Sequence, residues 1–569
     1  MIDFTAPASP LLNRLRTVYG DTVAAELAPA IGQLVANYAG RIPPRPTGWS
    51  ERDALLITYG DAITGADGVA PLTVLHDFLR RHCQREISFI HLLPFYPFTS
   101  DDGFSVTDFR QVRADLGNWD DIARLADDYR LVFDGVINHV SEASDYMNRY
   151  RTGDPACADF FIALDPQTDT SSVLRTRNLP LLHDYPTVSG VKWLWTTFSR
   201  DQLDLNYRNP RVLLEILDVL LGYAQRGAAM IRLDAIPYLW KELGTSCAHL
   251  PQTHELIKLI RDVYDLAAPH VLLLTETNVP HRENIKYFGA AGDEAQMIYN
   301  FSLPPLIVWS LFKGDAVILS EWARSLEFIG PRATYLNITA THDGIGMRPT
   351  EGLLSEPERA ELVQLAYDRG GDMTGKRNQD GTVSPYELNL SYFDAINDPR
   401  AAEPLELQVR RFLLAQAIPL ALIGLPGIYL HSLLGSRNDH AGVQRTGRAR
   451  SINRQQLTLS ALEQELADAD HLRAHVLTGY LRLLRIRGNE SAFHPDARQE
   501  IPDHGPAIFA VCRQNPATGR AVLALHNVSA APVTVNLLTA GHDLLGTGHW
   551  PAGRAVLQPY QIVWLARAV

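Results

Sequence analysis

Acidic and basic side chains recur in this sequence directly after short apolar runs. The motifs are FDGVINH with Asp134, Asn138 and His139, IRLDA with Arg232 and Asp234, LLTETN with Glu276, and ATHDG with His342 and Asp343. Each motif alone also fits a structural role, such as an ion pair or a turn. Desolvated unpaired charges are costly, so four such motifs at one edge of a fold favour a joint functional site. Convergent carboxylates flanked by His, Arg and Asn suit chemistry at an anomeric carbon, where one acid protonates the leaving oxygen and another attacks or stabilises the oxocarbenium-like centre.

Motifs for other chemistries are absent from the sequence. It contains no HxH, HExxH or CxxC spacing, and no GxGxxG or GxxxxGK[ST] loop follows a predicted strand. We therefore expect neither a metal ion nor an organic cofactor.

The apolar runs that precede the motifs alternate with amphipathic helical patterns from residue 54 onward. Runs such as ALLITYG, ISFIHLLPF and VLLLTET are apolar on both faces, as the strands of a parallel sheet are. About eight strand–helix units follow one another, which is the number that closes a (β/α)8 barrel. The pattern predicts an α/β fold, a TIM barrel, with the polar motifs around the mouth at the carboxyl ends of its strands.

Three further regions surround this alternation. Residues 1–50 carry apolar side chains at near-helical spacing and predict an N-terminal helical extension. The catalytic barrel is expected over 51–500, with long insertions at about 141–200 and 344–405 that follow strand ends and suit the acceptor side of a substrate pocket. After residue 500 short alternating strands predict a small antiparallel β domain over 501–569.

Composition limits the partners and the compartment. The chain has 569 residues, 52 Lys+Arg against 64 Asp+Glu, and a formal net charge of −12. This balance argues against a nucleic-acid or anionic-lipid partner. Apolar stretches too short to span a membrane, four scattered cysteines and no charged-then-apolar leader indicate a cytoplasmic protein. The sequence leaves the oligomeric state open, a homodimer included.

In their order along the chain, DGVINH, IRLDA, TET and THD resemble the four strand-end signatures of the α-amylase superfamily, glycoside hydrolase family thirteen. The resemblance implies that Asp234 is the nucleophile, Glu276 the general acid/base, and Asp343 the carboxylate that stabilises the transition state. It also implies that Arg232, His139 and His342 hold the nucleophile and the glucosyl hydroxyls.

Finer motifs resemble the sucrose phosphorylase group over nearly all of residues 50 to 500. These motifs are LLPFYPFTSDDGFSVTDF, HDGIG, SLPPL, SPYELN and RSINR. The resemblance implies that Asp101 and Arg450 grip the far end of the glucosyl unit and that Phe104 forms an aromatic platform beside it. A donor pocket closed after one sugar argues against an endo-acting amylase.

In a phosphorylase, phosphate rather than water must reach the glucosyl-enzyme, so a basic group must face the acceptor side. The first insertion offers Arg175 and Arg177 in VLRTRNLP. The resemblance implies that Arg177 handles phosphate.

The second insertion offers Tyr386 and Glu387 in SPYELN, where sucrose phosphorylases have Tyr-Gln. The longer members of the group, which have an N-terminal helical extension and Tyr-Glu at this point, resemble glucosylglycerate phosphorylases. This sequence has both features. Lys376 or Arg377, in GDMTGKRNQDG, could then meet an acidic acceptor.

We therefore predict a retaining glucoside phosphorylase that forms α-D-glucose 1-phosphate by double displacement, with inorganic phosphate as co-substrate. The favoured donor is 2-O-α-glucosylglycerate, and sucrose or sucrose 6'-phosphate come next. An amylosucrase-like transglucosidase or a sucrose hydrolase remains an alternative. A non-catalytic amylase-like barrel is a further alternative, against which the three retained carboxylates argue.

Overall fold

Eight parallel strands close into a barrel in the centre of the molecule. The computed structural model describes residues 9–175, 177, 179–290, 292–378 and 382–566. Around the barrel the strands are β1 (Leu55–Thr58), β17 (Leu425–Tyr429), β13 (Thr334–Ile338), β12 (Met297–Tyr299), β11 (Leu272–Thr275), β10 (Ala228–Leu233), β4 (Arg130–Gly135) and β3 (Phe89–Leu92). The predicted TIM barrel is confirmed.

Burial explains why these strands have continuous apolar sequences. Every barrel-strand residue except Arg130 is buried, because helices cover the outer face of the barrel and side chains fill its interior. The main helices are α3 (Pro71–His82), α4 (Trp119–Asp128), α6 (Pro210–Gln225), α7 (Pro251–Ala267), α9 (Leu303–Lys313), α10 (Val317–Arg324), α13 (Leu405–Ala421), α16 (Leu459–Ala467) and α17 (Leu472–Gly488). Among the described helices, none combines the length and the apolar composition needed to cross a membrane.

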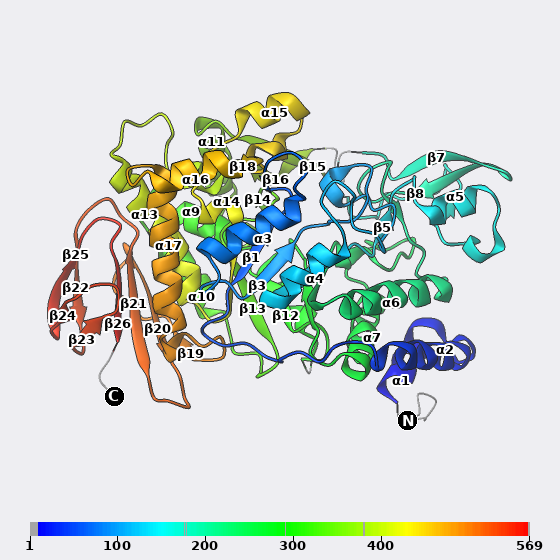
Figure 1. Cartoon of the computed structure of the whole chain (residues 1–569), viewed down its shortest axis with the longest axis horizontal. Coiled ribbons are helices and arrows are strands. Elements are labelled where there is room, and N and C mark those ends of the chain that lie inside the picture. Colours follow the sequence, from blue (N-terminus) through cyan, green and yellow to red (C-terminus); the bar gives the residue numbers. More distant parts are fainter. Residues whose placement is uncertain (1–8, 176, 178, 291, 379–381, 567–569) are drawn as a thin grey trace.

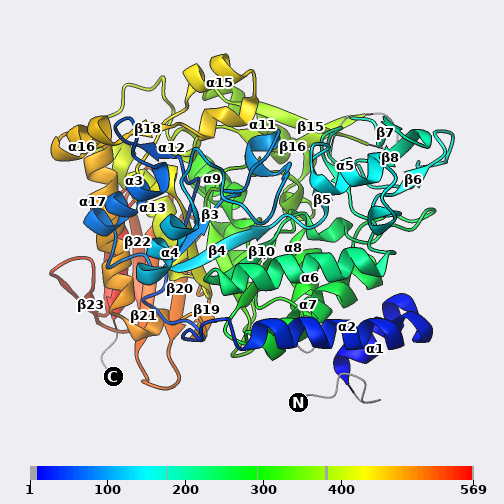
Figure 2. The same cartoon turned by 45° about the vertical axis from the view of Figure 1, so that its right-hand side comes forward.

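Both long insertions form small antiparallel sheets near the same edge of the barrel, the upper edge of Figures 1 and 2. The first contains α5 (Asp145–Arg151), β6 (Ala163–Leu164), β7 (Leu182–Thr187) and β8 (Gly190–Trp195). The second contains β14 (Ile345–Gly346), α11 (Glu356–Asp368), β15 (Asp372–Arg377), β16 (Val383–Asn389) and α12 (Tyr392–Ile396), and β16 is its central strand.

The two chain ends pack against different parts of the barrel (Figure 1). Helices α1 (Pro10–Tyr19) and α2 (Asp21–Ala39) lie against α7, and α2 also contacts α6 (Figure 2). At the other end an antiparallel sheet has the order β19-β20-β21-β26-β23-β24, and β22 pairs with β25. These strands are β19 (Arg498–Glu500), β20 (Ile508–Gln514), β21 (Ala521–Asn527), β22 (Val533–Leu537), β23 (Gly541–Asp543), β24 (His549–Trp550), β25 (Gly553–Leu557) and β26 (Ile562–Ala566). The predicted helical and β additions to the barrel are both present.

Candidate active site

One pocket at the carboxyl ends of the barrel strands gathers most of the predicted site residues. Its lining contains Asp101, Phe104, His139, Arg177, Arg232, Asp234, Glu276, His342, Asp343, Tyr386, Glu387 and Arg450. Arg175 and Lys376 are not part of this lining. The side chain of Arg377 lies outside what the structure describes.

Asp234 directly follows β10 and is held by the arginine two residues before it. The Arg232 guanidinium donates from Nη1 to Asp234 Oδ1 at 2.8 Å and also pairs with buried Asp134. Asp134 in turn lies 2.9 Å from Nε2 of His91. These contacts span β3, β4 and β10, so the barrel itself fixes the orientation of the Asp234 carboxylate.

The chain turns sharply after Asp234 and this turn contacts Glu276. Ala235 has φ +49°, in the left-handed region that non-glycine residues rarely adopt. Its backbone N–H donates to Glu276 Oε2 at 3.2 Å. Because Glu276 directly follows β11, the neighbouring strand, adjacent strand ends bring the two carboxylates to one place.

The environments of these two acids differ. Burial raises the pKa of Glu276 to about 7, and Arg232 opposes the shift while Asp234 and Asp343 add to it. Burial also raises the pKa of Asp234, but Arg232 counters this through a direct ion pair. Because Glu276 accepts only a backbone N–H in the described part of the chain, a proton shared between the two acids resides on Glu276. This is the protonation state that an attacking carboxylate and a general acid require.

Asp343 lies among three cationic or ionisable groups. Arg450 Nη1 is 2.7 Å from its Oδ1, Arg454 Nη2 is 3.7 Å from the same atom, and His342 Nε2 is 3.6 Å from Oδ2. Burial alone would raise the pKa of Asp343, but Arg450, His342 and Arg454 together hold it well below the usual value. Asp343 is therefore ionised at neutral pH.

Asp101, Phe104 and His139, which the sequence predicts for the donor end, line one part of the pocket. The Phe104 ring stacks on the His342 ring with centroids 5.1 Å apart and planes 8° apart. His139 Nε2 donates to the Phe104 carbonyl at 2.9 Å. Gln202 donates to Asp101 Oδ2 at 3.0 Å. The arrangement forms a wall with an apolar ring and polar groups around it, which suits a single sugar ring.

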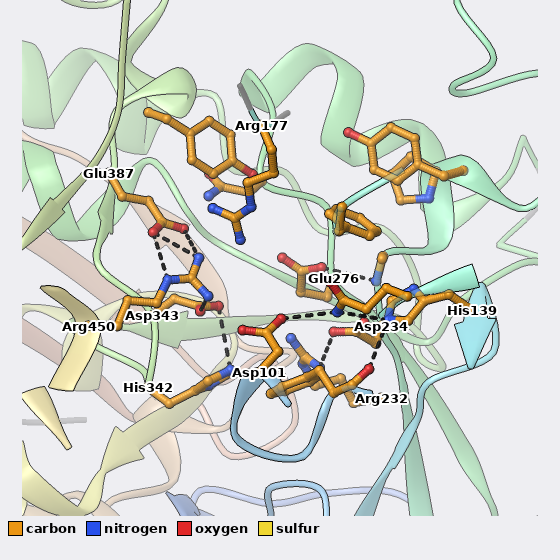
Figure 3. A pocket seen from close by; sticks show the side chains of 18 of the residues that line it. Asp101, His139, Arg177, Arg232, Asp234, Glu276, His342, Asp343, Glu387 and Arg450 are labelled. Atoms are coloured by element: carbon orange, nitrogen blue, oxygen red, sulfur yellow. Dashed lines mark hydrogen bonds and ion pairs between the residues drawn. The ribbon is translucent and has the colours of Figure 1, made fainter. Parts of the chain in front are cut away.

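On the acceptor side, Arg177 comes from the first insertion and Tyr386 from the second. The Arg177 guanidinium lies 5.7 Å from the centroid of the Tyr386 ring, and Figure 3 shows Arg177 pointing toward the carboxylates from the side opposite Arg232. Neighbouring Glu387 instead faces Arg450, which donates from Nη2 to its Oε1 at 2.7 Å (Figure 3). Arg450 thus bridges Asp343 and Glu387.

Two basic residues proposed from the sequence have other contacts. Arg175 donates to the Leu179 carbonyl. Lys376 Nζ lies 3.8 Å from Glu351 Oε1. Arg175 and Arg177 are only two positions apart in one loop. The sequence alone could not show which of the two side chains points into the pocket.

The pocket also contains residues that the sequence analysis did not single out. They are Phe198, Gln202, Ala235, Pro237, Tyr238, Asn278 and Val279. Asn278 follows Glu276 by two positions within TETN. Its place in a strand-end motif could therefore have predicted that it lines the pocket. Phe198 lies at the end of the first insertion and Gln202 just beyond it. No sequence pattern around them indicates that they line the pocket.

Comparison with known proteins shows which family the chain is similar to. Residues 85–324 match the alpha amylase catalytic domain. The chain is 47% identical to a glucosylglycerate phosphorylase of Allomeiothermus silvanus, with 98% of each chain covered. It is 43% identical to a glucosylglycerate phosphorylase of Escherichia coli, with 98% of this chain and 99% of that protein covered.

A solved structure supports the fold. The crystal structure of sucrose 6F-phosphate phosphorylase from Thermoanaerobacter thermosaccharolyticum superposes with a TM-score of 0.73 at 24% identity, over 84% of this chain and 94% of that one. The family is shown by the sequence identity to the curated relatives: the chain belongs to the α-amylase family, among its glucosylglycerate phosphorylases.

Proposed function

We propose that this chain catalyses the reversible phosphorolysis of 2-O-α-glucosylglycerate to α-D-glucose 1-phosphate and glycerate. The observation that carries the proposal is a pocket that brings together the carboxylates of Asp234, Glu276 and Asp343 with the guanidinium of Arg177. The two relatives above that are named glucosylglycerate phosphorylase support the choice of substrate. Inorganic phosphate is the co-substrate.

In the first half-reaction Asp234 attacks the anomeric carbon and forms a covalent glucosyl ester. Glu276 gives its proton to the glycosidic oxygen as the bond to glycerate breaks, so that glycerate leaves with a neutral hydroxyl. Asp343, held ionised by Arg450 and His342, stabilises the positive charge that develops on the sugar ring. Arg232 keeps the Asp234 carboxylate oriented for attack and stabilises its negative charge before the ester forms.

In the second half-reaction a phosphate oxygen attacks the same carbon and releases Asp234. Ionised Glu276 takes up the phosphate proton, which restores its starting state. Each displacement inverts the anomeric carbon, because the nucleophile attacks from the face opposite the leaving group, and two successive inversions retain the configuration. Arg177 would attract the phosphate and orient it, because a guanidinium binds phosphate through paired hydrogen bonds.

Two wider assignments belong to this proposal. We divide the chain into an N-terminal extension (1–50), a catalytic barrel with its insertions (51–500) and a C-terminal β domain (501–569). We also place the enzyme in the cytoplasm, and the scattered positions of its four cysteines, which show no disulfide-like spacing, support this choice.

The proposal is tested in the synthetic direction. The enzyme is supplied with α-glucose 1-phosphate and with glycerate, glycerol, fructose or fructose 6-phosphate, and phosphate release is measured. We expect glycerate to be used best and Asp234→Asn to release no phosphate with any acceptor, while its circular dichroism spectrum stays unchanged. Release of free glucose or glucan at a rate independent of phosphate and acceptor would contradict a phosphorylase.

A further inference from the structure

The turn after the first strand of the second insertion carries Arg348, a cation that the mechanism above does not use. Arg348 begins the short 3-10 helix η5 (Arg348–Thr350), two residues after β14. The preceding Met347 N–H donates to the Tyr386 carbonyl at 2.9 Å, which ties this turn to the acceptor wall. A Cβ on Gly346 would lie 2.5 Å from Asn278 Oδ1, so the same segment passes directly against Asn278 in the pocket lining.

The cations in and beside the pocket differ in how tightly they are paired, and Arg348 belongs to those beside it, since it is not part of the lining. On the donor side Arg232 lies 2.8 Å from Asp234 and Arg450 lies 2.7 Å from Asp343. Arg348 has a looser ion pair, since its Nη2 lies 3.8 Å from Glu283 Oε2 on α8 (His281–Asn284). Its side chain is 14% exposed, and its Nε has no hydrogen-bond partner among the described residues. A guanidinium with unused donors that is largely removed from water is suited to bind an anion.

Two further observations concern the pocket wall next to this cation. Burial raises the pKa of Tyr238 in the pocket wall to about 12, and of the neighbouring charges Arg348 opposes this rise most, ahead of Arg177. Asn278 also lines the pocket, and its Oδ1 is buried without a hydrogen-bond partner in the described part of the chain. Unmet acceptors of this kind cost free energy unless a ligand supplies a donor.

We propose that Arg348 and Asn278 form the acceptor subsite for a small hydroxy acid, Arg348 binding its carboxylate and Asn278 Oδ1 accepting a hydrogen bond from its free hydroxyl. This inference rests on the proposed function and assigns the recognition of glycerate to particular atoms. Arg177 and Arg348 then have separate tasks, phosphate and carboxylate. The subsite selects acids over polyols of the same size, because only the acid satisfies the guanidinium.

The test compares acceptors within one variant. With α-glucose 1-phosphate as donor, we expect Arg348→Gln to lower kcat/KM for glycerate by about 10- to 100-fold, the loss of a charge-assisted contact. Its loss in hydrolysis of α-glucosyl fluoride, where water is the acceptor, should be at least about tenfold smaller. Arg348→Lys should recover part of the glycerate activity, because the charge remains but the paired donors do not.

Glu283→Gln separates binding from a structural role. It removes the carboxylate that competes for Arg348 and should lower the KM for glycerate, the opposite of Arg348→Gln. If both variants instead raise the KM alike, the Arg348–Glu283 pair is only structural and the inference is wrong. The inference would also be overturned if Arg348→Gln lowered kcat/KM equally for glycerate and for α-glucosyl fluoride hydrolysis. A selective loss of kcat/KM for glycerate in Lys376→Gln, without one in Arg348→Gln, would overturn it as well. A wild-type enzyme that does not glucosylate glycerate at all would contradict the proposed function itself.

Discussion

The pocket gives two neighbouring carboxylic acids different protonation states, because their hydrogen-bonding partners differ. Asp234 has the Arg232 guanidinium at 2.8 Å, whereas Glu276 accepts a backbone N–H at 3.2 Å. Both are deeply placed, so the cost of ionising both together is high and the group without the ion pair keeps the proton. The division of labour that we propose, with Asp234 as nucleophile and Glu276 as acid, thus follows from a single arginine two residues before Asp234.

A pH dependence follows from the position of Glu276. Its pKa of about 7 means that Glu276 loses its proton as the pH rises through about 7. Cleavage of glucosylglycerate needs that proton, so kcat/KM should fall about tenfold per pH unit on the alkaline side. Hydrolysis of α-glucosyl fluoride needs no proton for its leaving group and should lack this alkaline limb. The same limb with both substrates would show that Glu276 is not the acid.

Arg177 allows a prediction about the fate of the glucosyl-enzyme. Water needs no cationic partner, whereas phosphate must approach a pocket lined by carboxylates. Arg177→Ala should therefore raise the KM for phosphate by about 10- to 100-fold and increase the ratio of glucose to glucose 1-phosphate. Arg175→Ala is the matched control from the same loop, since Arg175 does not line the pocket. An unchanged product ratio in Arg177→Ala would place the phosphate elsewhere.

At the scale of elements, one ion pair joins the second insertion to the donor site. Glu387 on β16 is 2% exposed and Arg450 lies on η6 (Ala449–Asn453). Arg450 donates to Glu387 from Nε at 3.1 Å and from Nη2 at 2.7 Å, and its Nη1 reaches Asp343. The sheet of the second insertion and the Asp343 carboxylate, for which we propose a catalytic role, are thus held by one guanidinium.

Loss of this pair should loosen the sheet. Glu387→Gln keeps the side-chain size but removes the charge, and we expect a cost of about 1–3 kcal/mol. Amide hydrogen exchange in β16 should then be about 5- to 150-fold faster, and the KM for the glucosyl donor should rise. Glu406→Gln is the control, because its pair with Arg410 is largely exposed, at 83% and 43%. Unchanged exchange in β16 would show that backbone pairing alone holds the sheet.

The elements that the sequence predicted best are those with periodic patterns. The barrel strands are apolar on both faces, and the carboxylates follow strand ends, so both fold and carboxylates were accessible from local sequence. The Glu387–Arg450 pair was not, because the two residues are 63 positions apart and belong to a strand of the second insertion and to the short helix η6. For the same reason Glu387 could be assigned only to the acceptor side as a whole, whereas its contact in the structure is with a donor-side residue.

At the scale of the whole molecule, the N-terminal helices stabilise the barrel from outside, away from the pocket. Helix α1 buries Leu11, Leu12, Leu15 and Val18. Its Arg14 side chain pairs with three carboxylates, Glu255 and Asp262 on α7 and Asp293 in the loop before β12, at 3.3, 2.7 and 3.1 Å. The extension therefore joins two successive barrel units.

Arg14 provides a direct test of this role. Its side chain is 15% exposed, and Arg14→Ala would leave the three carboxylates facing one another without a cation. We expect a destabilisation of about 1–3 kcal/mol, a lower thermal unfolding midpoint at fixed scan rate, and faster proteolysis within residues 9–39. Arg16→Ala on the same helix is the control, since Arg16 is 41% exposed and its partner Asp21 is 90% exposed. Turnover per folded molecule should be nearly unchanged in both variants, because α1 contacts α7 on the outside of the barrel. A loss of kcat in Arg14→Ala at full folding would instead mean that the extension acts on the pocket through α7.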